Sequence, residues 1–417
     1  MSPQLSPPVR RGRADVGDHY DAIVVGLGAV GAATLYQLAK LGSARGMRVL
    51  GIDCFAPPHD RGSSHGESRI TRLAIGEGDA YVPLVKRSHA IWRELEARTG
   101  RSILTQTGGL ILAPRDGAAD HHGKPDFVRR TIACAERFDI DHQVLDAAGI
   151  RARFPQFNLQ GNEIGYFEPE SGFVRPEQAI AAQLEVARAS GAEVHEGEPV
   201  LALEGGRGSG TGDRPVKVRT ATATYTADRV VVAAGAWLPE FLGEAARDAW
   251  RGEFEVYRQV MYWFDASEAA FDFTAPRMPI FIWMYGDGEQ DYMYGFPSAD
   301  AARPALKVAT EQYVHTTSPD ALVREVDAAE IEAMYQSRIA GRFPKIGGHA
   351  IDARACMYTV TRDRHFVIDT LPDAPQVLVV SACSGHGFKH SAGLGEAIAQ
   401  RLLGQTPATD LRAFAMR

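Results

Sequence analysis

The sequence is poor in cysteine and has no long apolar run. Its four cysteines stand far apart among 417 residues and form no CxxC pair, which argues against a disulfide framework and against a structural zinc site. We therefore expect no metal and a reducing, cytoplasmic setting. No stretch approaches the roughly 18 apolar residues that a membrane-spanning helix needs, so no membrane partner is expected.

The chain also lacks an excess of positive charge. The net charge is -7 at pH 7, with acidic and basic residues interspersed along the chain. Binding to phosphate backbones needs a basic face, so a nucleic-acid partner is not expected. Residues 1–18 are rich in proline and arginine, carry no apolar period and predict a flexible leader. No apolar stretch follows Arg10 and Arg11 before the first predicted strand, which argues against a secretory signal.

What the sequence does have is a β-α-β unit near its start. Residues 20–25 are an apolar, β-branched run of strand length, and residues 32–41 are rich in helix-forming residues. Between them lies the glycine-rich segment 26–31, and a second apolar run, 48–52, ends at Asp53. This order predicts dinucleotide binding. The alternative is a glycine turn in another α/β fold.

The individual residues of this unit suit that chemistry. Gly26 permits a tight turn, Gly28 lets the backbone approach a pyrophosphate, and Gly31 lets helix and strand pack closely. The helix N-terminus offers free N–H groups to the phosphates. Asp53 is placed to accept hydrogen bonds from ribose hydroxyls, and it disfavours a cofactor with a 2′-phosphate.

A later segment favours FAD over NAD. Residues 225–237 predict a strand followed by Ala-Ala-Gly-Ala, in which Gly235 is the glycine. Small residues after a strand let the chain pass close to a bound dinucleotide, and FAD-dependent oxidoreductases resemble this arrangement. An ordinary buried strand that ends at a glycine is the alternative. Residues 253–345 are rich in aromatics and predict an antiparallel sheet, and residues 205–213 predict a hairpin turn or surface loop.

Three further segments carry a family likeness: 57–83, 292–311 and 356–396, the last of which contains CMYTVTRDRHFVID and SGHGFKHSAGLGE. With the glycine-rich unit they resemble the monomeric sarcosine oxidase and N-methyltryptophan oxidase family. The resemblance implies an α/β (α+β) fold, with a Rossmann-like FAD-binding domain and an interleaved antiparallel-sheet substrate domain. It places the FAD-binding domain in residues 19–105, 171–252 and 363–417, and the substrate domain in residues 106–170 and 253–362.

The resemblance also implies roles for residues beside the flavin. Cys356 matches the cysteine that bonds to the flavin 8α-methyl group, so the FAD is expected to be covalent. Lys307 matches the lysine near flavin N5 that promotes reaction with oxygen, and His65 matches a histidine in the flavin-proximal loop. Further residues are expected to contact the cofactor: Ser63, Ser64, Arg69, Gly235, Gly385, Gly387, Phe388 and Lys389.

On the substrate side, Arg72 and Lys389 match the residues that bind the substrate carboxylate. Tyr294 and Tyr358 match tyrosines that border the substrate. One position departs from the family: where its members carry a histidine four residues after the active-site lysine, this chain has Glu311. We expect an acid there to change the polarity of the pocket and the preferred amine. The candidate catalytic residues are thus Lys307, Arg69, His65, Tyr358 and Glu311.

Without the resemblance, the roles of the two arginines, of Lys307 and of Cys356 stay open. Arg69 and Arg72 would share one face if their segment is helical, and would then hold an anion or form a solvated charged face. Lys307 lies in a strand-like run, 305–309. Two interpretations are open: an edge residue that prevents aggregation, and a buried functional cation. Cys356 alone is typical of an inert core cysteine.

The sequence therefore predicts flavin-dependent oxidation of a secondary (N-methyl) amino acid. The imine would hydrolyse to an aldehyde and a primary amine, and O2 would be reduced to H2O2, with no obligatory side-chain base. Three alternatives stay open: a flavin dehydrogenase, an oxidase of a cyclic amine such as proline or pipecolate, and a flavin-carrying subunit without activity. We expect a monomer.

Overall fold

The computed structural model describes residues 19–117, 119–205, 214–242, 244–250, 252–286, 288 and 290–416. The leader predicted for residues 1–18 and nearly all of the loop predicted for residues 205–213 lie outside these ranges. Within the described ranges, no helix is both long enough and apolar enough to cross a membrane.

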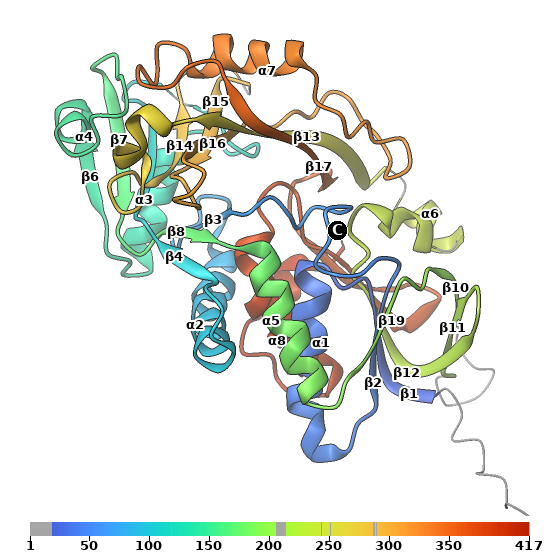
Figure 1. Ribbon diagram of the computed structural model, residues 1–417. Coiled ribbons are helices and arrows are strands. Elements are labelled where there is room, and N and C mark those ends of the chain that lie inside the picture. Colours follow the sequence, from blue (N-terminus) through green and yellow to red (C-terminus); the bar gives the residue numbers. More distant parts are fainter. Residues whose placement is uncertain are drawn as a thin grey trace, which may run out of the picture.

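The first sheet is built around the predicted β-α-β unit (Figure 1). β1 (His19–Val25) and β2 (Val49–Asp53) pair in parallel, and α1 (Ala29–Gly42) connects them, as predicted. β1 also pairs in parallel with β12 (Thr224–Val232), and β12 with β19 (Ala374–Ser381). The strand order is β10-β11-β12-β1-β2-β9, with β19 beside β12 and β18 beside β19. The other strands are β9 (Glu193–Glu196), β10 (Val200–Glu204), β11 (Val216–Thr220) and β18 (Val367–Leu371).

Helices α1, α5 (Pro176–Ala189) and α8 (Ser391–Leu402) lie side by side against this sheet (Figure 1). Small residues permit the close packing of α8: a Cβ on Gly395 would lie 2.5 Å from the Cβ of Ala33 in α1. On its other side α8 packs against α2 (Val82–Thr99), where a Cβ on Gly393 would lie 2.4 Å from the carbonyl oxygen of Leu84. The chain segment that ends in α8 is thereby fixed against the dinucleotide unit.

The second sheet has the strand order β17-β13-β16-β15-β14-β5-β7-β6. Its pairs are antiparallel, as predicted for the aromatic region, except that β14 and β5 run in parallel. β5 comes from a separate chain segment, so no hairpin fixes its direction relative to β14. Its strands are β5 (Gly109–Pro114), β6 (Gln143–Asp146), β7 (Glu163–Glu168), β13 (Phe254–Asp265), β14 (Ile280–Met284), β15 (Tyr292–Phe296), β16 (Ala305–Ala309) and β17 (Ala350–Thr361).

Helix α7 (Ala328–Met334) and the π-helical turn after it, Tyr335–Ile339, cover the second sheet on one side (Figure 1). Buried aromatic residues, among them Phe264, Phe281 and Trp283, fill the space between them. Most of the aromatic residues of this region are therefore core. The remaining helices are α3 (Phe127–Arg137), α4 (Ala147–Arg153) and α6 (Glu244–Ala249).

A small third sheet joins β3 (Arg69–Thr71), β8 (Gly172–Val174) and β4 (Leu104–Gln106). The segment is therefore not helical, and the condition under which Arg69 and Arg72 would share a helical face is not met. Pairing with β8 extends the backbone at Arg69 and Thr71 instead. In an extended segment successive side chains point to opposite faces. The domain boundaries stay a prediction.

Candidate active site

The glycine-rich turn has the geometry that its residues predict. Gly26 has φ +84°, and a Cβ there would lie 2.7 Å from the carbonyl oxygen of Ala233. A Cβ on Gly31 would lie 1.7 Å from the carbonyl oxygen of Gly26. Helix α1 begins at Ala29 without a side-chain cap, and the Ala29 N–H donates to Ser64 Oγ at 3.4 Å. A helix N-terminus of this kind offers N–H groups and a positive dipole end to phosphate.

Asp53 ties this turn to the end of β2. Its Oδ2 accepts from the N–H of Leu27 at 2.7 Å, and its Oδ1 accepts from the N–H of Phe55 at 2.8 Å. The carboxylate of Asp53 thus orders the glycine-rich turn as well as lining the space beside it. Each oxygen keeps a further lone pair for a ribose hydroxyl.

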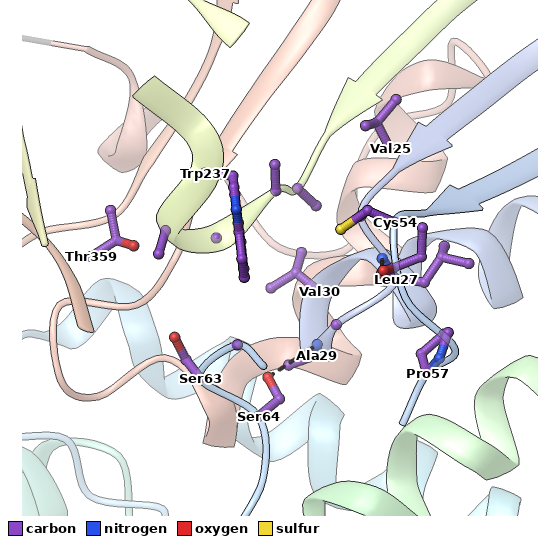
Figure 2. A pocket seen from close by; sticks show the side chains of 18 of the residues that line it. Val25, Leu27, Ala29, Val30, Cys54, Pro57, Ser63, Ser64, Trp237 and Thr359 are labelled. Carbon is purple, nitrogen blue, oxygen red and sulfur yellow. Dashed lines mark hydrogen bonds between the residues drawn. The ribbon is translucent and has the colours of Figure 1, made fainter. Parts of the chain in front are cut away.

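A cavity of about 480 Å³ extends from this glycine-rich turn. Figure 2 shows the indole of Trp237 in this cavity near Val30, with Ala29, Ser63 and Ser64 together on the side across from it. Ten of the residues predicted to bind the cofactor line the cavity: Gly26, Gly28, Asp53, Ser63, Ser64, Arg69, Gly235, Gly385, Gly387 and Phe388. An apolar cavity that ends at a glycine-rich helix N-terminus fits FAD. The sequence reasoning did not single out Trp237 or Cys54, which also line it.

Three predicted cofactor residues do not line this cavity. Gly31 packs behind the turn, and Lys389 lines a neighbouring pocket. Cys356 is buried, with its Sγ 3.8 Å from Nη2 of Arg69 and 3.7 Å from the carbonyl oxygen of Ser63. Arg69 and Ser63 both line the cavity, so the thiol lies directly behind its wall.

Arg69 is a fixed cation at this wall. Its guanidinium donates to the carbonyl oxygens of Ser63, at 2.8 Å, and Ser68, at 2.9 Å. Burial alone would lower the pKa of Arg69, but the nearby Cys356 and Tyr358 side chains raise it above its ordinary value.

Lys307 is buried in the interior of the second sheet. In β16 it lies opposite Trp263 of β13 and Phe296 of β15, so an edge role is wrong. Its Nζ donates to the carbonyl oxygens of Gly66, at 2.5 Å, and Ser68, at 2.8 Å. Burial, and then the charge of Arg69, lower the pKa of Lys307 well below its ordinary value.

His65 lies close to these cations but lines neither the cavity nor the neighbouring pocket. Neither of its ring nitrogens has a hydrogen-bond partner among the described residues. Burial, and then the charge of Arg69, lower the pKa of His65 to about 3, so its ring is neutral near pH 7.

A second pocket of about 60 Å³ adjoins the cavity. Arg69, Tyr358, Gly385 and Phe388 line both spaces. The pocket brings the residues predicted on the substrate side together with Lys307, which was predicted near the flavin. The substrate-side residues are Arg72, Lys389, Tyr294, Tyr358 and Glu311. The hydroxyl groups of Tyr294 and Tyr358 are hydrogen-bonded to each other at 2.9 Å.

Arg72 and Lys389 share a counter-ion, Glu77, that the sequence reasoning missed. Nη2 of Arg72 donates to both oxygens of Glu77, at 2.9 and 2.7 Å. Nζ of Lys389 donates to the carbonyl oxygen of His386 at 2.8 Å and lies 3.7 Å from Glu77 Oε1. Burial lowers the pKa of Lys389 to about 8. Burial would raise the pKa of Glu77, but Arg72 and Lys389 hold it well below its ordinary value.

Glu311 is paired with a second missed residue, His122. His122 Nε2 lies 3.0 Å from Glu311 Oε2, and its Nδ1 lies 3.2 Å from Glu77 Oε1. Both ring nitrogens face carboxylate oxygens, which only an imidazolium satisfies. Burial opposes the charge, but Glu311 and Glu77 raise the pKa of His122 above its ordinary value. The His-His pair at 121–122 was the available signal in the sequence.

The predicted absence of a metal stays a prediction. His121, His122 and Glu311 place three potential ligand atoms within 4.8 Å of one another. However, Glu311 Oε2 already faces His122 and accepts from the hydroxyl groups of Tyr292 and Tyr313, each at 2.6 Å. The hydrogen bonds account for the cluster, so we assign no metal to it.

Comparison with known proteins agrees with this geometry. Residues 21–401 match the family model described as FAD dependent oxidoreductase. The chain is 39% identical over 398 residues to a monomeric sarcosine oxidase from Streptomyces avermitilis, covering 95% of this chain and 96% of that protein. It is 34% identical over 401 residues to an N-methyl-L-tryptophan oxidase from Salmonella newport, covering 95% and 98%.

Among solved structures, NikD, an unusual amino acid oxidase essential for nikkomycin biosynthesis, is similar in fold. Its open form gives a TM-score of 0.78 at 23% identity, covering 96% of this chain and 98% of that one. The family model and the curated relatives each span nearly the whole described chain. The chain therefore belongs to the FAD-dependent oxidoreductase family, in which its relatives include monomeric sarcosine oxidase and N-methyl-L-tryptophan oxidase.

Proposed function

We propose that this protein oxidises a compact secondary amino acid, such as sarcosine, with FAD as the electron acceptor and O2 as the oxidant. The observation that carries the proposal is the 60 Å³ pocket, in which Arg72 and Lys389 lie beside the residues that border the flavin cavity. A pocket of this size favours a small side chain over an indole. Bound FAD would supply a two-electron acceptor for the C–H bond next to nitrogen.

The charges of the pocket favour a substrate carboxylate. Arg69, Arg72, Lys389 and His122 are cations, whereas Glu77 and Glu311 are anions, so the pocket carries a net positive charge. An amino acid that binds with a charged carboxylate and a neutral amine carries one negative charge and suits such a pocket. The neutral amine that remains is the form that loses a hydride readily.

The residues on the flavin side suit the second half of the reaction. Arg69 lines both the cavity and the substrate pocket, and Lys307 lines the substrate pocket beside it. Negative charge develops on oxygen as it accepts electrons, and a fixed cation stabilises that charge without reorganising. For sarcosine the balanced reaction converts sarcosine, O2 and water to glycine, formaldehyde and H2O2.

We further propose that Cys356 holds FAD through a thioether to the flavin 8α-methyl group. The position of its Sγ behind Arg69 and Ser63 supports this, because both residues line the cavity. The new C–S bond would replace one C–H and one S–H bond, and oxygen would take up the two electrons and two protons.

Product analysis tests the proposal. Purified FAD-loaded protein is given sarcosine, N-methyltryptophan, proline, pipecolate or glycine in air, and formaldehyde, H2O2 and the amine product are quantified. We expect formaldehyde, glycine and H2O2 in equal amounts from sarcosine, with N-methyltryptophan a poorer substrate. Substrate oxidation without H2O2 would favour a dehydrogenase, and a preference for proline or pipecolate would favour a cyclic-amine oxidase.

A further inference from the structure

Hydrogen bonds from the described residues reach only one oxygen of the Glu311 carboxylate. Oε2 faces His122 Nε2 at 3.0 Å and accepts from the hydroxyl groups of Tyr292 and Tyr313 at 2.6 Å. No hydrogen bond from another described residue reaches Oε1. Although Oε1 has no such partner, it is not fully enclosed by protein. It is open to the pocket that Glu311 lines. This oxygen is therefore available to a ligand.

Oε1 lies close to Gly385, which borders the flavin cavity. A Cβ on Gly385 would lie 3.0 Å from Glu311 Oε1 and 2.9 Å from His122 Nε2. Gly385 has φ +81° and lines both the flavin cavity and the substrate pocket. The missing side chain leaves a gap at the junction of the two spaces, and Oε1 borders that gap.

The charge of Glu311 is held in place. Burial would raise the pKa of its carboxyl group, but His122 outweighs burial and lowers the pKa to about 2. His122 cannot rotate away without losing its contact with Glu77. The other titratable side chains around the pocket are His121, Tyr292, Tyr294, Tyr313, Tyr358, His386, Arg69, Arg72, Lys307 and Lys389.

We propose that Oε1 of Glu311 recognises the amino group of the substrate, accepting its N–H and stabilising the positive charge that the nitrogen gains during oxidation. This inference rests on the proposed function and deepens it by naming the residue that recognises the amine. The substrate must carry an N–H, so the pocket selects secondary amines over tertiary amines. Arg72 and Lys389 hold the carboxylate end, and Glu311 holds the amine end.

The chemistry gives this contact a catalytic value. As the C–H bond next to nitrogen breaks, both of its electrons leave with the hydrogen, and the nitrogen lone pair forms the C=N bond. The nitrogen becomes a cation while it keeps its N–H. A hydrogen bond from a cation to a carboxylate is stronger than one from a neutral amine. The contact therefore stabilises the transition state more than the bound substrate.

Two aromatic acids of nearly equal shape test this contact without turnover. Pyrrole-2-carboxylate carries an N–H beside its carboxylate, and 2-furoate carries an oxygen at the same position. Neither has an oxidisable amine, so binding is measured from the change in the flavin visible spectrum of the FAD-loaded protein. We expect pyrrole-2-carboxylate to bind about tenfold to a hundredfold more tightly than 2-furoate, as a hydrogen bond to a charged acceptor implies. Equal affinities in the native protein would overturn the inference.

Variants separate recognition from a structural role of Glu311. In Glu311→Gln and Glu311→His the preference for pyrrole-2-carboxylate should fall by about tenfold, while 2-furoate still binds. Tyr313→Phe keeps the carboxylate and removes one bond to Oε2, so the preference should persist. Equal losses of both ligands in the Glu311 variants would show a structural role and contradict the inference. If sarcosine is not oxidised but the preference holds, the proposed substrate is wrong and the role of Glu311 stands.

Discussion

Nη2 of Arg72 donates to both carboxylate oxygens of Glu77, at 2.9 and 2.7 Å, in a site where both side chains are only 2% exposed. The arginine that is expected to bind the substrate carboxylate therefore already has an internal anion. A substrate carboxylate must either displace Glu77 from Arg72 or bind Arg72 together with Glu77. This pair consequently sets both the stability of the pocket and its affinity for anions.

Glu77→Gln tests that competition. Removing one partner of a buried ion pair costs about 3–5 kcal/mol of unfolding free energy, so the thermal unfolding midpoint should fall. Affinity for 2-furoate should rise, since Arg72 no longer has a competing anion. Glu94→Gln is a matched control, because Glu94 pairs with Arg87 at the surface, where a pair is worth about 0–1 kcal/mol. Unchanged unfolding and unchanged furoate binding in Glu77→Gln would contradict this account.

Lys389 should give carboxylate binding a pH dependence. Burial lowers its pKa to about 8, so it is charged below that pH and neutral above it. The dissociation constant of 2-furoate, whose own charge is constant there, should be flat below pH 8 and rise above it. Lys389→Arg should remove the rise, because a guanidinium stays protonated. A rise of the same size in the arginine variant would assign it to another group.

Lys307 is expected to act after the flavin has been reduced. Lys307→Met should slow the reoxidation of the reduced protein by air by about a hundredfold or more, the scale on which one fixed electrostatic donor acts. Anaerobic reduction by the substrate should change much less. Stopped-flow absorbance measures the two steps separately. If the loss falls mainly on the reduction step, Lys307 serves the substrate instead of oxygen.

The proposed thioether at Cys356 can be tested without a substrate. After acid precipitation of the native protein, the yellow colour should stay with the pellet, whereas in Cys356→Ala it should move to the supernatant. Cys134→Ala is the control: that thiol is buried in α3 and accepts from the N–H of Ile75. Flavin that stays bound in Cys356→Ala would point to another attachment or to very tight non-covalent binding.

The sequence predicted the parts of the site that local patterns encode. The glycine turn at Gly26, the buried Lys307 and the acid at Glu311 all follow from residue order or from the family resemblance. The structure places Gly26 in the flavin cavity and Lys307 and Glu311 in the adjoining pocket. The spacing of Arg69 and Arg72 left open whether their segment is helical, and the pairing of β3 with β8, about a hundred residues later in the chain, makes it extended.

The charged partners were not predictable in the same way. Glu77 and His122 come from two loops far apart in sequence, and only the folded chain brings them between Arg72 and Glu311. An isolated glutamate or a histidine in a loop is ordinary in a sequence. The parallel pairing of β5 with β14 likewise depends on how two separate segments meet.

The most direct test of the proposed oxidase is a two-step absorbance experiment on the FAD-loaded protein. Sarcosine is added without oxygen while the visible flavin band is followed, and air is then readmitted. The account predicts that sarcosine bleaches the band and that air restores it quickly with one H2O2 per flavin. If no secondary amino acid bleaches the band although 2-furoate still binds, the proposed oxidase is contradicted.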